Sequence, residues 1–144
     1  MRLDYRSDTR GTAPYRCALD GQILNAPEIP TTLPTMDEVM GSPDLPDDEG
    51  LVRFYVDRMN AGALNVHTVH AETEGMGHLA TFTSLVRALK EHGAGFVRLC
   101  DVAARLAASE LPVCEVIRTT LPGRAGWISA QGPNKSPLFP KRPL

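Results

Sequence analysis

The residues best suited to chemistry lie close together in residues 65–75, which read Asn-Val-His-Thr-Val-His-Ala-Glu-Thr-Glu-Gly. His67 and His70 carry imidazoles, which bind metals or transfer protons near neutral pH. On an extended strand, a spacing of three residues directs the two side chains to opposite faces. The chain also lacks an H-E-x-x-H pattern, so this pair by itself does not predict a zinc site.

His70 is the stronger candidate because of the position that its neighbours predict. Val66, Thr68 and Val69 are β-branched and favour a strand over residues 64–70, and an acidic, glycine-ended turn follows. In a parallel α/β sheet, catalytic side chains lie where the strands end. His70 therefore has two open interpretations: a hydrogen-bonded histidine that anchors a loop, or a general acid.

Three carboxylates are candidates to assist His70. Asp8 is expected at the end of a strand over residues 2–7, and a neighbouring strand would bring it toward His70, where it would fix the tautomer and favour the protonated imidazole. The alternative is a turn in which the Asp8 side chain binds nearby backbone. Glu72 and Glu74 share the parity of His70, so each either flanks the site or is a solvated turn charge. The solvated interpretation is favoured for Glu74, and Glu72 is left open.

Helices are expected at four places, from capping residues and from apolar side chains recurring every three or four positions. The clearest covers residues 78–92 and ends at Gly93. The N-terminal caps expected for the other three are Thr35 with Glu38 as its capping-box partner, Asp47 and Asp101.

The strands expected between these helices define the fold class. Residues 13–34 hold four prolines and no sustained period, which is typical of a covering loop. Strands that alternate with helices predict an α/β fold with a parallel sheet. A closed eightfold barrel needs roughly 200 residues or more, so a chain of 144 residues accommodates only part of one. The strands are expected over residues 2–7, 64–70, 95–100 and 113–121.

Composition indicates an ordinary globular chain and excludes several classes of protein. The apolar and charged fractions are 42% and 22%, which fits one domain. A net charge of −2 and a pI of about 6.1 offer no basic field for nucleic acid. The 3 cysteines form no C-x-x-C pair, and no segment has the character of a signal peptide or membrane span. We therefore expect a cytoplasmic location.

Four motifs occur together in a fixed order. They are Tyr-Arg-Ser-Asp-Thr-Arg-Gly at residues 5–11, Ile-Pro-Thr-Thr-Leu-Pro-Thr at 29–35, Thr-Val-His-Ala-Glu-Thr-Glu-Gly at 68–75 and Pro-Gly-Arg-Ala-Gly-Trp at 122–127. In this order and at about this spacing, they resemble the C-terminal half of the enzymes in the deformylase branch of the polysaccharide deacetylase superfamily. The resemblance extends over nearly all of residues 5–131.

The resemblance implies a fold and a reaction. The fold would be the C-terminal half of a distorted, incomplete β/α barrel over residues 1–131, with a disordered, proline-rich basic tail over residues 132–144. The reaction would be metal-dependent hydrolysis of an N-formyl amide on a lipid-linked amino sugar in lipid A modification. His70 would be the general acid and Asp8 the residue that orients it, although relatives often have Asp-Trp where Gly11-Thr12 stand here. Arg10 and Glu72 are assigned to substrate binding.

The same resemblance implies what the chain would need from elsewhere. Members of the family carry the base aspartate and the ligands of a divalent metal in an N-terminal half, so we expect neither metal ligands nor activity in this chain alone. The partner of the full enzyme would be undecaprenyl-phosphate-linked formamido-arabinose. Contact with the cytoplasmic face of the inner membrane and self-association are left open. The alternative function is a non-catalytic domain that binds a sugar or associates through an open sheet edge.

Overall fold

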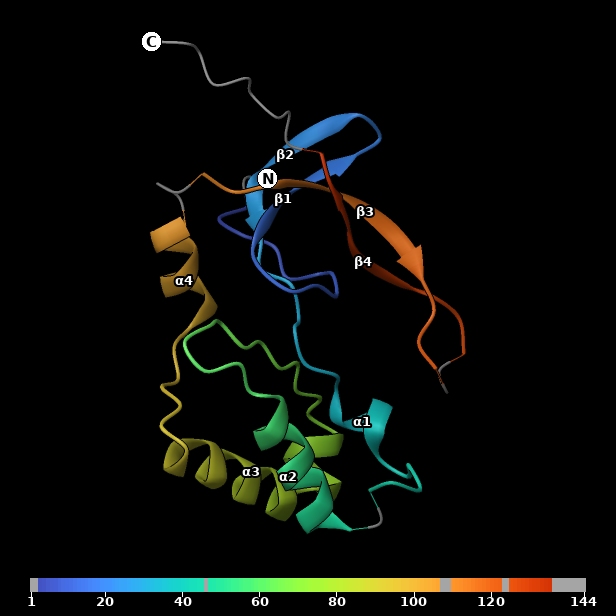
Figure 1. The fold of residues 1–144 in the computed structure, drawn as a ribbon, viewed down its shortest axis with the longest axis vertical. Coiled ribbons are helices and arrows are strands. Elements are labelled where there is room, and N and C mark those ends of the chain that lie inside the picture. Colours follow the sequence, from blue (N-terminus) through green and yellow to red (C-terminus); the bar gives the residue numbers. More distant parts are fainter. Residues whose placement is uncertain (1–2, 46, 107–109, 123–124, 136–144) are drawn as a thin grey trace.

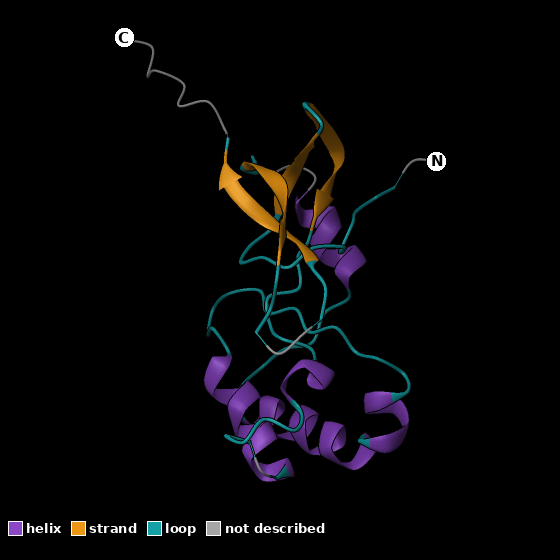
Figure 2. Cartoon of the chain, turned by 90° about the vertical axis from the view of Figure 1, so that its right-hand side faces the viewer, coloured by secondary structure: helices purple, strands orange, loops and turns teal. Residues whose placement is uncertain are grey.

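A computed structural model describes residues 3–45, 47–106, 110–122 and 125–135 of the chain. Strands gather at one end of the molecule and helices α2 and α3 at the other, with extended segments between them (Figure 1). The second view shows the same separation (Figure 2). The elements in chain order are β1 (Tyr15–Leu19), β2 (Gln22–Glu28), α1 (Met36–Val39), α2 (Asp48–Arg58), the π-helical turn η1 (Thr73–Gly77), α3 (Leu79–Glu91), α4 (Leu99–Leu106), β3 (Val113–Thr119) and β4 (Ile128–Asn134).

The four strands form one open sheet in the order β2-β1-β3-β4. The central pair, β1 and β3, is parallel and brings Cys17 opposite Cys114, while β2 and β4 are antiparallel edges. The α/β class is confirmed, and the unclosed sheet fits part of a barrel. The sheet is mixed rather than fully parallel, however, and the helices form a block between two strand pairs instead of following each strand in turn.

The prediction that residues 13–34 form a covering loop is wrong, because residues 15–28 form the β1–β2 hairpin. Tyr15 and Cys17 point inward with exposures of 0% and 3%, and the turn uses positive φ at Asp20 and Gly21. Pro27 lies in β2, an edge strand, where the missing N–H is tolerated. The prolines interrupt the residue pattern of this segment, but they do not prevent β1 from pairing with β2.

Three other expected strands are absent from the described residues, and the tail was placed wrongly. Among residues 3–7 only Arg6 pairs, through an isolated bridge to Glu28. Residues 64–70 form no strand, although the Val66 carbonyl accepts the N–H groups of Thr32 and Leu33. In the range 95–100, the last two residues belong to α4. The tail expected from residue 132 is wrong for its first three residues, which belong to β4; residues 136–144 lie outside the described residues.

The helices are predicted better than the strands. Glu38 accepts the Thr35 N–H at 3.0 Å at the start of α1, and Asp47 accepts the Gly50 N–H at 2.7 Å at the start of α2. Gly93 follows α3 with a φ of 84°, as a helix-ending glycine should. The cap expected at Asp101 is wrong, because α4 already begins at Leu99. These signals succeed because each depends on residues within about one turn.

Within the described ranges, the buried side chains form three small clusters instead of one large core. One lies among the helices, one in the sheet and one between α4 and the extended segments. The hydroxyl of Tyr55 donates to the Pro34 carbonyl at 3.1 Å, which links α2 to the segment before α1. The buried members of the clusters are Leu33, Met36, Leu51, Tyr55 and Leu85; Tyr15, Cys17 and Cys114; and Ile29, Val66 and Ala103.

We predict that Gly11→Ala destabilises the chain by about 1–3 kcal/mol, as overpacking does. A Cβ at Gly11 would lie 2.9 Å from the Cβ atoms of both Gln131 and Pro30, so backbone must shift. Gly75→Ala is the matched control, since nothing lies within 4 Å of its Cβ and its φ is not positive. Urea denaturation measures both variants, and equal stabilities would contradict the close approach.

Candidate active site

The His70 imidazole lies beside a carboxylate of α1. Its Nδ1 atom is 3.3 Å from Asp37 Oδ1, and the two side chains are 38% and 49% exposed. Asp37 occupies the first turn of α1, whose start is fixed by the Thr35 and Glu38 pair. The contact does not have the geometry of a hydrogen bond, so it is an ion pair when the ring is protonated, and it leaves Nε2 as the nitrogen available to a substrate. The structure therefore forms a histidine–carboxylate pair at a place that solvent can reach.

The contact predicted between Asp8 and His70 is absent from the part of the chain that the structure describes. The Asp8 side chain is 74% exposed and lies 3.7 Å from Arg6 Nε. The reason is Glu28, which is 1% exposed and accepts the N–H groups of Asp8 and Thr9 at 2.7 and 2.8 Å. These bonds bind the main chain of the loop and leave the Asp8 carboxylate at the surface. Asp37 takes the place that the sequence assigned to Asp8.

Arg10, which the sequence assigned to substrate binding, has its guanidinium bound within the chain. Its two terminal nitrogens donate to the Leu33 carbonyl at 2.6 Å and to both oxygens of Glu38 at 2.7 and 2.8 Å. The side chains of Arg10 and Glu38 are 22% and 8% exposed. Since Glu38 also caps α1, Arg10 fixes the helix that carries Asp37. The role of Arg10 in substrate binding stays a prediction, whereas its contacts within the chain give it a structural role at α1.

The two glutamates after His70 differ in a way that strand parity does not foresee. Glu72 is exposed, so its expected role in substrate binding stays a prediction. Glu74, which was expected to be solvated, is 0% exposed, and its Oε2 accepts the His70 N–H at 2.9 Å. The expectation for Glu74 is wrong because residues 73–77 form a π-helical turn, which directs this side chain inward.

His67, the other histidine of the stretch, lies on the inner side of Glu74. Its Nε2 is 3.5 Å from Glu74 Oε1, and its Nδ1 is 3.2 Å from the Pro34 carbonyl oxygen. Burial lowers the pKa of His67, and the negative charge of Glu74 opposes that shift. The Tyr55 ring packs edge-on at 4.9 Å, and burial also raises the pKa of the Tyr55 hydroxyl. No sequence signal predicted this network, because His67 and Glu74 meet through the turn.

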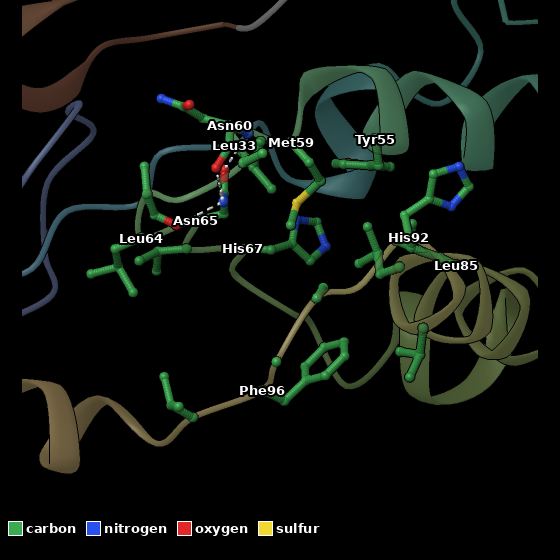
Figure 3. Close-up of a pocket in the computed structure, with 18 of the residues that line it drawn as sticks. Leu33, Tyr55, Met59, Asn60, Leu64, Asn65, His67, Leu85, His92 and Phe96 are labelled. Carbon is green, nitrogen blue, oxygen red and sulfur yellow. Dashed lines mark hydrogen bonds between the residues drawn. The ribbon is translucent and has the colours of Figure 1, made fainter.

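His67 also lies in the wall of a mainly apolar pocket of about 600 Å³ (Figure 3). The pocket lies between α3 and the extended segments, with Tyr55 on the α2 side and Phe96 across from it. This volume is in the range of small-molecule sites. His70 is not among the lining residues, whereas its neighbour Val69 is. Residues 67–70 therefore contribute His67 and Val69 to the pocket wall and His70 to the pair with Asp37.

No group of three or more histidine, cysteine, aspartate or glutamate side chains in the described part of the chain is arranged to hold a metal ion. None of the helices that the structure describes combines the length and apolar character that crossing a membrane requires.

Comparison with known proteins gives several curated relatives, of which two are described below, whereas no family model matches. The chain is 33% identical over 127 residues to a probable 4-deoxy-4-formamido-L-arabinose-phosphoundecaprenol deformylase of Shewanella sediminis, covering 88% of this chain and 40% of the relative. It is 30% identical over 133 residues to the protein of that name from Wigglesworthia glossinidia brevipalpis, covering 91% of this chain and 45% of the relative.

These similarities confirm the resemblance to the deformylase branch of the polysaccharide deacetylase superfamily that the sequence motifs indicated. Within that superfamily, it is related to the formamido-arabinose deformylases. The chain spans less than half the length of the relatives that it matches, at 40% and 45%.

We predict that Arg10→Ala destabilises the chain by about 2–3 kcal/mol, somewhat less than a fully buried ion pair because Arg10 is partly exposed. The substitution removes the guanidinium from the Glu38 carboxylate, which keeps the Thr35 N–H, and from the Leu33 carbonyl. Arg53→Ala is the control, since it removes an exposed pair with Glu49 that contributes no more than about 0.5 kcal/mol. Urea denaturation measures the free energy of unfolding of both variants. An unchanged value for Arg10→Ala would contradict the structural role of Arg10 and leave substrate binding as its remaining predicted role.

Proposed function

We propose that this chain supplies the general acid for hydrolysis of an N-formyl amide on a lipid-linked amino sugar. The carrying observation is the His70 imidazole, exposed by 38% and paired through Nδ1 with Asp37 at 3.3 Å. The two relatives, which are named as probable deformylases of a phosphoundecaprenol-linked formamido sugar, support this reaction class. The substrate proposed for the longer protein is the lipid-linked formamido-arabinose of those names.

The chemistry of amide hydrolysis explains why a histidine is needed. Water adds to the formyl carbon, and the C–N bond of the tetrahedral intermediate then breaks to release formate and the sugar amine. The departing nitrogen must gain a proton as that bond breaks, because an amide anion is a very poor leaving group. His70 protonated at Nε2 would donate this proton, and the Asp37 carboxylate would stabilise the imidazolium and hold its ring.

A divalent metal would polarise the formyl oxygen and lower the pKa of the attacking water. The residues described here do not fit such a site, because they contain no cluster of three or more suitable side chains. We therefore propose that the metal ligands and the base belong to the part of the relatives that this chain does not span. In that arrangement, His70 and Asp37 line one side of a cleft whose other side lies on the remaining part of the enzyme.

We predict that the isolated chain neither hydrolyses an N-formyl amino sugar nor binds a divalent metal tightly. General acid catalysis by a histidine contributes typically only about 10²–10⁴-fold, so His70 without activated water would give a negligible rate. Formate release and isothermal titration with Zn²⁺ measure the two properties. Turnover by the isolated chain that a chelator abolishes would show that this chain holds a complete site.

The catalytic role of His70 is tested in a chimera in which this chain replaces the matching region of the Shewanella sediminis relative. We predict that His70→Ala lowers kcat by about 10²–10⁴-fold and changes KM little, because the proton transfer is needed only in the transition state. Asp37→Asn should lower kcat less, since the ring remains but loses its orienting charge.

The control variant in the chimera is His92→Ala, which removes an exposed histidine at the end of α3. Equal changes in kcat and KM for His70→Ala, or no change in either, would refute the acid role. A folded chimera with no activity would instead favour the second candidate, a domain that associates through the open edges β2 and β4.

A further inference from the structure

We propose that the apolar pocket of about 600 Å³ binds part of the polyprenyl group of a lipid-linked sugar whose reacting end is held at His70. The choice of ligand rests on the proposed function, because a substrate of that class joins a sugar, through a phosphate, to a long hydrocarbon group. The affinity of the pocket for such a group is a property of this protein by itself and is measured without any reaction.

The interior of the pocket consists of buried hydrocarbon side chains. Leu33, Val66 and Leu85 are at most 7% exposed, and Tyr55 is 1% exposed. Figure 3 shows three of these side chains around the pocket, with Phe96 across from Tyr55. Apolar cavities exclude water and take up hydrocarbon ligands. The lining therefore favours a ligand that has no hydrogen-bonding groups.

Polar side chains of the lining already have partners within the protein. The Asn65 amide accepts the Asn60 N–H at 3.0 Å through Oδ1 and donates to the Asn60 carbonyl at 3.0 Å through Nδ2 (Figure 3). His67 Nδ1 and the Tyr55 hydroxyl both bind the Pro34 carbonyl, at 3.2 and 3.1 Å. A polar ligand would lose its bound water and find few partners in exchange, which is unfavourable. The arrangement of these groups thus selects against a polar ligand.

The rim of the pocket reaches the residue next to the proposed general acid. Val69 lines the pocket, is 46% exposed and directly precedes His70, so their Cα atoms are about 3.8 Å apart. Phe96 and Val97 also line the pocket and are exposed. These three apolar side chains form the rim at which the pocket opens to solvent. A ligand with its polar end at His70 has this rim within one residue.

Large apolar side chains are also exposed in the turn that follows His70. Met76 in η1 is 75% exposed, and Leu79 at the start of α3 is 53% exposed. Exposed apolar side chains that gather at a site mark a surface for an apolar partner or ligand. Moving each CH₂ group from hydrocarbon into water shifts an equilibrium unfavourably by about fourfold. A polyprenyl group near His70 therefore requires an apolar environment, which the pocket supplies.

Two variants alter the pocket without changing His70 or Asp37. Gly95 lines the pocket, and a Cβ at this position meets nothing within 4 Å, so Gly95→Phe places a ring in the space without a backbone clash. Phe96→Ala removes part of the rim, and the fold depends little on a side chain that is 57% exposed. The matched control is Ile23→Ala, because Ile23 is 58% exposed, lies in β2 and does not line the pocket.

Isothermal titration of the isolated chain tests the pocket with geranyl phosphate, farnesyl phosphate and inorganic phosphate. Farnesyl phosphate should bind at least about 10-fold more tightly than geranyl phosphate, because it buries more CH₂ groups. Inorganic phosphate should not bind. Gly95→Phe and Phe96→Ala should each weaken the binding of farnesyl phosphate by about 10-fold, whereas Ile23→Ala should leave it unchanged. Equal affinities in all four proteins, or affinities independent of the length of the prenyl group, would refute the pocket as the site.

Kinetics of the chimera test whether the pocket serves the reaction. Gly95→Phe should raise KM by about 10-fold for formamido-arabinose phosphate that carries a farnesyl group, and leave KM unchanged for the same sugar phosphate without it, since only the first substrate loses binding. No difference between the two substrates would refute the inference and indicate that the remaining part of the enzyme fills the pocket. A chimera that hydrolyses neither substrate would contradict the proposed function, and the titrations would still decide whether the pocket binds a polyprenyl group.

Discussion

The contacts of Arg10 are the constraint on which the rest of the arrangement depends. Its main chain joins the sheet, because its N–H donates to the Ser129 carbonyl and its carbonyl accepts the Gln131 N–H. Its side chain reaches the helical end through Leu33 and Glu38. Helix α1 has only 4 residues and could not hold its own position by helix formation alone. Arg10 therefore sets the place of α1, and with it the place of Asp37.

Two buried carboxylates then fix the loops that carry the candidate site residues. Glu28 accepts three hydrogen bonds through one oxygen, from the N–H groups of Asp8 and Thr9 and from the Thr9 hydroxyl. Glu74 accepts one, from the His70 N–H, and its other oxygen faces His67. A carboxylate with several donors is stable when buried, whereas one with a single donor requires a further partner. Glu28 therefore holds its loop through several bonds from one oxygen, whereas Glu74 holds the main chain of His70 through one bond and presents its second oxygen to His67.

The proposed function of the His70 and Asp37 pair depends on the similarity of the chain to the formamido-arabinose deformylases. The chain spans 40% and 45% of those relatives, its sheet is open, and its described residues hold no metal cluster. The proposed division of labour assigns proton donation to this chain, through His70 and Asp37, and water activation to the remaining part of the enzyme. The same segment, residues 67–70, supplies His67 and Val69 to the apolar pocket and His70 to that pair.

The sequence by itself determined most of the helices and the α/β class, and it drew attention to the stretch around His70. Caps such as Thr35 with Glu38 and Asp47 act within one turn, and the motifs of the chain are similar to those of its relatives. Tertiary structure alone decided that residues 15–28 pair as a hairpin, that Asp37 and not Asp8 meets His70, and that Glu74 is buried beside His67. Those outcomes depend on contacts between residues far apart in the chain, or on a turn that reverses the parity of an extended strand. Local propensity carries no information about either.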